Sequence, residues 1–96
     1  MTLTYHNQLK LLHDLLDEQL IYQTSDTSEF TQIKRLVQAI MAERSIEHTP
    51  LKQYLPEIYG YGIAGERIQC DYEHITTHRE NIYEWKVAIL QSASSM

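Results

Sequence analysis

The sequence has one cysteine and few basic residues. A lone cysteine, Cys70, excludes a framework of internal disulfides and is typical of a reducing compartment. Eight Lys and Arg against thirteen Asp and Glu give a net charge of −5, which disfavours nucleic acid as the partner because phosphate binding requires a basic surface. No run approaches the ~20 apolar residues that cross a bilayer, and the start of the chain lacks the basic and apolar regions of a secretory signal. We therefore expect a cytoplasmic protein that binds neither nucleic acid nor membrane.

The sequence also has no strand pattern. Apolar residues recur at spacings of three and four, as in amphipathic helices, and no run demands an alternating strand. Ninety-six residues, 43% of them hydrophobic, are enough for one core and too few for two. The sequence predicts an all-α fold in a single domain, residues 1–96, with a frayed tail at 91–96. The expected architecture is an up-and-down bundle of three long helices plus one short helix broken by proline.

The first helix is expected over about residues 3–22. Its apolar side chains cover about half of the helical circumference, which is typical of a helix that packs against two neighbours. These neighbours are helices of the same chain or of a partner. Because a chain of 96 residues does not easily cover so wide an arc, the sequence favours a homodimer with Leu11 and Leu15 at its interface.

The second helix has a clear start signal. Asp26 followed by Glu29 is typical of a capping box, with Ser28 as a competing cap. Arg44 falls in the expected last turn, where a cation complements the helix dipole. The apolar face of this helix comprises Phe30, Ile33, Leu36, Val37, Ile40 and Met41.

Proline and glycine are scarce, and their positions predict the breaks in the third element. Thr49 and Pro50 are typical of a helix start, and Pro56 predicts either a kink or a separate short helix after one turn. All three glycines lie in the segment 60–65, which predicts a long loop or hinge.

The last helix is expected to begin between Glu66 and Asp71 and to run to about Leu90. Its apolar stripe comprises Ile68, Tyr72, Ile75, Ile82 and Ile89, with Trp85 at one flank.

Cys70, His74 and His78 are spaced four and four apart, so they share one helical stripe. Thiolate and imidazole are ligands that zinc accepts. Three ligands on one straight helix extend over about 12 Å, too far to bind one ion, so only the pair His74 and His78 is a feasible metal site. A complete site would need a further ligand from another helix, such as His6, His13 or His48. The alternative interpretation is that these residues are partly exposed and bind nothing.

The sequence carries no zinc-protease helix motif, no phosphate-binding glycine loop and no nucleophile elbow. It therefore predicts no catalytic residue and no cofactor, and it favours a protein that is not an enzyme.

Seven tyrosines are the main compositional excess, and three of them lie in the segment 54–61. Tyrosine buries a ring and keeps its hydroxyl hydrated, which suits interfaces and pocket mouths. If a partner binds, Tyr59 and Tyr61 together with Trp85 form the preferred patch. The alternatives are ordinary positions at the edge of the core, or a small-ligand pocket lined by the tyrosines and Trp85.

Three segments resemble the YtzH-like family of small proteins from Bacillus-type bacteria: YHNQLKLL at 5–12, SEFTQIKRLV at 28–37 and HITTH at 74–78, followed by Trp85. The resemblance extends over nearly the whole chain and implies a cytosolic protein of a Firmicute. It carries over no activity, cofactor or catalytic residue.

We therefore expect a small helical protein that acts by binding a protein partner or a second copy of itself. The alternative is a metal-binding helical protein that uses His74 and His78.

Overall fold

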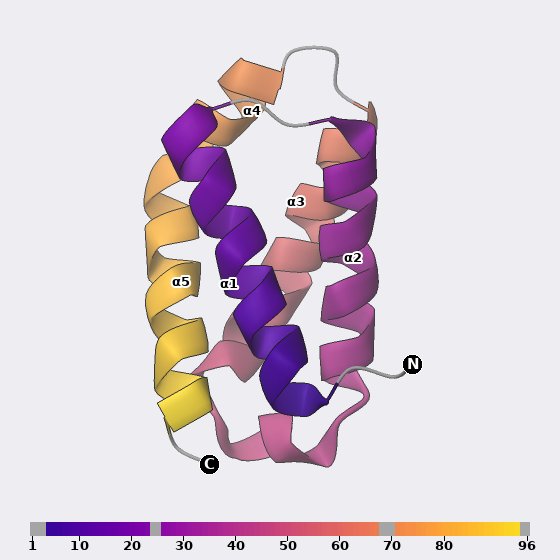
Figure 1. Cartoon of the computed structure of the whole chain (residues 1–96), viewed down its shortest axis with the longest axis vertical. Helices are drawn as coiled ribbons and strands as arrows, with labels where there is room; N and C mark the ends of the chain where they lie inside the picture. Colours follow the sequence, from indigo (N-terminus) through magenta and orange to yellow (C-terminus); the bar gives the residue numbers. More distant parts are fainter. Residues whose placement is uncertain (1–3, 24–25, 68–70, 95–96) are drawn as a thin grey trace.

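The computed structural model describes residues 4–23, 26–67 and 71–94, and within these ranges the chain is helical and contains no strand (Figure 1). The all-α prediction is confirmed. The described chain divides into more helices than expected: α1 (Tyr5–Tyr22), α2 (Thr27–Met41), the 3-10 helices η1 (Arg44–His48) and η2 (Pro50–Tyr54), α3 (Leu55–Arg67), α4 (Asp71–Thr77) and α5 (Arg79–Ser94).

Helix α1 lies in front in Figure 1, between α5 on one side and α2 on the other, and α3 lies behind. The closest helix pairs are α2 with α3, α1 with α5, α1 with α2, and η2 with α5. The wide apolar arc of α1 is thus covered inside the chain, with Leu9, Leu12 and Leu16 fully buried. The width of the apolar arc is therefore not an argument for a homodimer. Among the described residues, no helix has the combination of length and apolar character needed to span a membrane.

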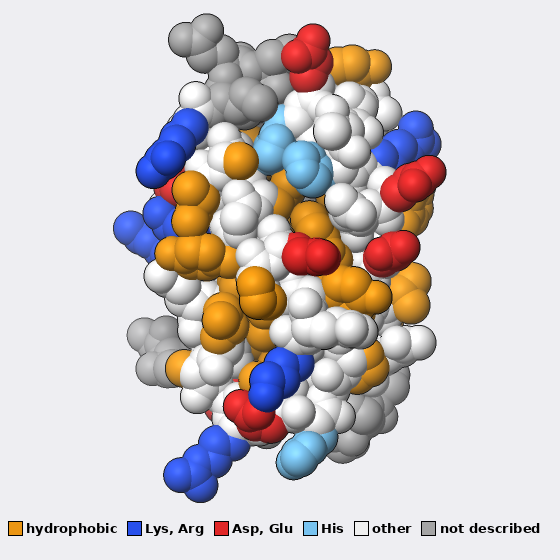
Figure 2. Space-filling model, turned by 180° about the vertical axis from the view of Figure 1, so that it is seen from behind, with side chains coloured by type: hydrophobic (Ala, Val, Ile, Leu, Met, Phe, Trp, Pro, Cys, Tyr) orange, Lys and Arg blue, Asp and Glu red, His pale blue; other side chains and the backbone are white. Residues whose placement is uncertain are grey.

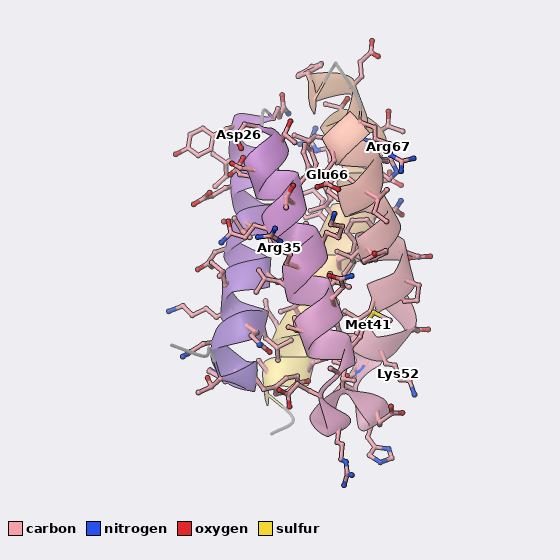
Figure 3. The ribbon with its side chains drawn as sticks, turned by 90° about the vertical axis from the view of Figure 1, so that its right-hand side faces the viewer. Asp26, Arg35, Met41, Lys52, Glu66 and Arg67 are labelled. Atoms are coloured by element: carbon pink, nitrogen blue, oxygen red, sulfur yellow. The ribbon has the colours of Figure 1, made fainter. Side chains whose placement is uncertain are left out.

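Helix α2 begins after the predicted cap Asp26, and α1 begins at Tyr5, two residues beyond its expected start. The Thr4 hydroxyl accepts a hydrogen bond from the backbone N–H of Asn7 at 3.1 Å, and Asp26 Oδ1 accepts one from the N–H of Glu29 at 3.0 Å. These bonds satisfy N–H groups that have no partner within the first helical turn. Figure 3 shows Asp26 at the start of α2 and Met41 at its end. The predicted place of Arg44 in the last turn of α2 is wrong, because α2 ends at Met41 and Arg44 belongs to η1.

The predicted loop at 60–65 is wrong: α3 runs through all three glycines, and none of them has a positive φ. Gly62 and Gly65 are buried against α2. A Cβ on Gly65 would lie 2.1 Å from Cδ1 of Phe30, and one on Gly62 would lie 3.2 Å from the Phe30 carbonyl oxygen. These glycines therefore serve the close packing of two helices, and not a turn. Pro56 sits in the first turn of α3, where a backbone N–H is not needed for the helix.

The predicted last helix is divided into α4 and α5 at His78. The Thr76 hydroxyl donates to the carbonyl oxygen of Tyr72 at 2.8 Å, and His78 Nδ1 bonds the carbonyl oxygen of His74 at 2.9 Å. The His78 N–H is shared between the carbonyl oxygens of His74 and Ile75 at 3.3 and 3.2 Å, so the division is a local irregularity, beside side chains that bond carbonyls of the preceding turn. At the other end α5 continues to Ser94, beyond the expected start of the tail at 91.

Candidate functional site

The two histidines of the predicted metal site lie in a cluster of rings centred on Tyr61. The Tyr61 and His74 rings are stacked, with centroids 4.5 Å apart and an interplanar angle of 12°. Phe30, His78 and Trp85 present their rings to Tyr61 edge-to-face at 5.6, 5.2 and 5.4 Å. Stacked and edge-to-face rings are favourable arrangements that stabilise a core beyond the burial of their area.

One ring nitrogen of each histidine lies at hydrogen-bond distance from a backbone carbonyl oxygen. His74 is buried, and its Nε2 lies 3.0 Å from the carbonyl oxygen of Tyr61, while His78 Nδ1 lies 2.9 Å from the carbonyl oxygen of His74 in α4. A ring nitrogen that donates to a carbonyl cannot also bind a metal, whereas the other nitrogen of the same neutral ring keeps its lone pair. In the part of the chain that the structure describes, no group of three or more His, Cys, Asp or Glu is placed to bind a metal ion. Cys70 lies outside the described residues.

The residues predicted for a partner interface do not form one exposed patch. Leu15, Tyr61 and Trp85 are buried in the core, and Leu11 and Tyr59 are partly buried against it. Tyr61 and Trp85 are in ring contact with one another, so the structure brings this pair together, but inside the protein. Trp85 does not line an open pocket with the tyrosines, as the ligand-pocket alternative expected. Its side chain is buried, and its Nε1 donates to Glu57 Oε2 at 3.3 Å.

A different apolar surface is exposed on α5. Tyr83, Val87 and Leu90 are 49%, 54% and 54% exposed, and their spacing of four and three places them on one face of the helix. Trp85 and Ile89, on the opposite face, are buried in the core. We call the three exposed residues the α5 ridge. Helix α5 therefore presents apolar side chains both to the core and to the outside.

A groove lies on each side of the α5 ridge. The first, of about 400 Å³, separates the ridge from η2 and is lined by Pro50, Gln53, Tyr54, Tyr83, Glu84, Val87, Ala88 and Gln91. The second, of about 290 Å³, separates it from α1 and is lined by His6, Lys10, His13, Asp14, Ile89, Leu90 and Ala93. Figure 2 shows one face of the molecule, on which hydrophobic side chains and carboxylates are mixed over α3 and α5. A ridge between two grooves is the surface shape that helices use when they pack against each other.

The charges beside the ridge are partly fixed by contacts within the chain. Lys86 Nζ donates to Asp17 Oδ1 at 2.5 Å, which ties α5 to α1 and lowers the pKa of Asp17. The same ammonium lies 5.5 Å from the centroid of the Tyr83 ring. Glu80 and Glu84 are exposed on α5. The surface is thus apolar along the ridge and carries charges of both signs, Arg79, Glu80 and Glu84, toward the start of the helix.

The model of the YtzH-like protein family matches residues 3–89. The chain belongs to the YtzH-like family. It is also similar to the uncharacterized protein YtzH of Bacillus subtilis (strain 168), with 26% identity over 85 residues, which cover 88% of this chain and 91% of that protein. No solved structure matches the chain significantly. The YtzH-like match confirms the resemblance and includes all of α1, α2 and α3 and most of α5.

The sequence prediction did not include the α5 ridge, although the spacing of its apolar residues is typical of one helical face. Val87 and Leu90 fall on the helical face opposite Trp85 and Ile89, so the helix is apolar on two sides. The predicted apolar stripe contained Ile82 and Ile89, which are buried, and the second apolar side of the helix was not considered.

Proposed function

We propose that this protein acts in the cytoplasm as a non-enzymatic binding module, and that the α5 ridge binds its protein partner. The observation that carries the proposal is the exposure of Tyr83, Val87 and Leu90, about half each, in one row on the outer face of α5. Large apolar side chains gathered on a helix face are typical of interaction sites. The single cysteine supports a location in the reducing cytoplasm.

The surroundings of the ridge support the proposal. Tyrosine is a residue that interfaces favour, because its ring supplies contact area at a low cost in side-chain entropy. The two flanking grooves provide recesses for side chains of a partner, and the groove beside η2 exposes a second tyrosine, Tyr54, on its far wall. A rigid helix that is packed on its inner face holds these groups in place before binding, which reduces the entropy lost on association.

Site-specific photocrosslinking in the bacterial cell tests the proposal. A benzophenone amino acid would replace Val87 on the ridge or Gln32, an exposed residue on α2, as the matched control. We expect a discrete protein adduct from position 87 after irradiation and none from position 32, because only the ridge contacts a partner.

The adduct would be identified by mass spectrometry and should disappear when Leu90→Glu is combined with the probe, since a carboxylate on the ridge opposes burial. The absence of any adduct at position 87, or the same adducts at both positions, would contradict the proposed function.

A further inference from the structure

We propose that the groove between α5 and η2 holds an arginine side chain of the protein partner, beside apolar side chains that pack on the ridge. The inference rests on the proposed function of the ridge and adds the chemistry of the partner segment. Two observations carry it: the side chains that line the groove, and the distribution of charges around α5.

The groove has the composition of a site for a planar cation. Among the described residues that line it, Glu84 is a carboxylate and none is Lys, Arg or His. Gln53 and Gln91 add side-chain carbonyl oxygens, which accept hydrogen bonds. Tyr54 lies on the η2 wall and Tyr83 on the α5 wall, so each wall carries an aromatic ring. A cation is attracted both to a carboxylate and to the face of such a ring, whereas an anion is repelled by the carboxylate.

Arginine fits these groups better than lysine does. Its guanidinium is flat and carries five donors in a fixed fork, so it can stack on a ring and bond a carboxylate at the same time. The lysine ammonium is a compact, strongly hydrated charge without a plane to stack. Tyr54 is the ring available for stacking, because the Lys86 ammonium already lies 5.5 Å from the centroid of the Tyr83 ring. Glu84, on the opposite wall, is the acceptor for the fork.

The cations of α5 lie on its other flank. Lys86 donates to Asp17 at 2.5 Å, which places it on the side of α5 that faces α1 and balances its charge. Arg79 precedes Lys86 by seven residues, about two helical turns, and therefore shares that flank. Glu80 precedes Glu84 by four residues, about one turn, and lies with it toward η2. The ridge thus has positive charge on the side of α1 and negative charge on the side of η2.

The lysine of η2 does not neutralise the groove. Lys52 is absent from the residues that line the groove, and its ammonium donates to Glu47 of η1. A further carboxylate, Glu57 of α3, reaches α5 at Trp85, where it accepts from Nε1 at 3.3 Å. The whole chain has a net charge of −5, which favours a partner segment of opposite charge at this flank.

Two tripeptides test the inference on the purified protein. Acetyl-Leu-Arg-Leu-amide is the probe, and the same peptide with citrulline in place of arginine is the control, since citrulline keeps the planar end group and lacks the charge. Heteronuclear NMR would follow the side-chain amide signals of Gln53 and Gln91 up to about 10 mM peptide. We expect the arginine peptide to shift these signals and the citrulline peptide to bind about three- to tenfold more weakly, because the charge-assisted hydrogen bonds are lost.

Substitution of the carboxylate locates the contact. Glu84→Gln should weaken binding of the arginine peptide about three- to tenfold and leave binding of the citrulline peptide unchanged. Glu18→Gln makes the same change of net charge on α1 and should bind the arginine peptide as the wild type does. Both glutamates are exposed, so both variants should fold. Unmoved Gln53 and Gln91 signals over the whole titration, or equal affinity for the two peptides, would overturn the inference.

Photocrosslinking from position 87 separates this inference from the proposed function. Val87 lines the same groove, so a probe there reports whether a partner occupies it. Glu84→Arg should reduce the yield of the adduct about tenfold or more, because two cations then oppose each other, while Glu18→Arg should leave the yield unchanged. An adduct that Glu84→Arg does not reduce overturns the arginine contact and still supports the proposed function. The absence of any adduct without these substitutions contradicts the proposed function itself.

Discussion

Gly65 of α3 lies directly against the ring of Phe30 in α2, and a Cβ at this glycine would come within 2.1 Å of Cδ1 of that ring. The ring is fully buried, so it has no free space into which it can move. Gly65→Ala should lower the free energy of unfolding by about 1–3 kcal/mol, because the strain of overpacking exceeds the gain of alanine in a helix. Urea denaturation measures this change.

Gly60 provides the matched control within the same helix. A Cβ added to Gly60 meets nothing within 4 Å. Gly60→Ala should therefore raise the free energy of unfolding by about 0.5–1 kcal/mol, since alanine loses less backbone entropy than glycine in a helix. Equal effects of the two substitutions would contradict the packing role of Gly65.

Gly60 and Gly65 show which features of the fold the sequence alone did not predict. The N-terminal cap of α2 depends on Asp26 and Glu29, three positions apart, so a local pattern predicted it. The contact of Gly65 with Phe30 joins residues 35 positions apart, and nothing local distinguishes a glycine that allows close packing from one that ends a helix. The predicted hinge was wrong for that reason.

The sequence also predicted only part of the candidate site. The spacing of Tyr83, Val87 and Leu90 is visible in the sequence, but α5 is apolar on two sides. The side of Ile82 and Ile89, which packs in the core, was predicted from the sequence, whereas the exposure of the second side follows from the packing of α5 against α1 and η2. Likewise, the spacing of His74 and His78 fits a metal site, while the stacking of His74 and the edge-to-face contact of His78 on Tyr61 are properties of the tertiary structure.

The hydroxyl of Tyr61 donates to Gln19 Oε1 at 2.6 Å in the interior. Tyr61→Phe should lower the free energy of unfolding by about 1–2 kcal/mol, because it removes a buried hydrogen bond and keeps the ring. The exposed Tyr72 is the control, and Tyr72→Phe should change stability by less than ~0.5 kcal/mol. The prediction would be wrong if both variants unfolded at the same urea concentration as the wild type.

Acid should destabilise the protein partly through Glu66, which Figure 3 shows on α3 turned toward α2. The Thr31 hydroxyl and the Lys34 ammonium, at 2.9 Å, donate to this carboxylate and hold its pKa below the usual value. A carboxyl whose pKa is lower in the folded state stabilises the protein above its unfolded pKa, and this contribution is lost as the pH falls through the folded pKa. The free energy of unfolding should therefore decrease as the pH falls below about 5.

Comparison of variants isolates the part that Glu66 contributes to this pH dependence. Glu66→Gln cannot ionise, so the wild type should exceed it in stability at pH 6, and the difference should shrink toward pH 3. Glu18→Gln, at an exposed position of α1, is the control and should follow the wild type at each pH. A difference between wild type and Glu66→Gln that stays constant with pH would show that the ion pair with Lys34 does not contribute.

Ser92 connects the end of α5 to η2 and is fully buried. Its Oγ accepts a hydrogen bond from the Leu51 N–H at 3.2 Å and donates one to the Ala88 carbonyl oxygen at 2.8 Å. Ser92→Ala leaves the buried N–H without this acceptor and should cost about 1–3 kcal/mol. Since 1.4 kcal/mol corresponds to a factor of ten, the Leu51 amide should exchange with solvent roughly tenfold faster or more. Gln91→Ala, at the exposed neighbouring position, should leave that exchange rate unchanged, and an equal rate in Ser92→Ala would refute the role of the serine.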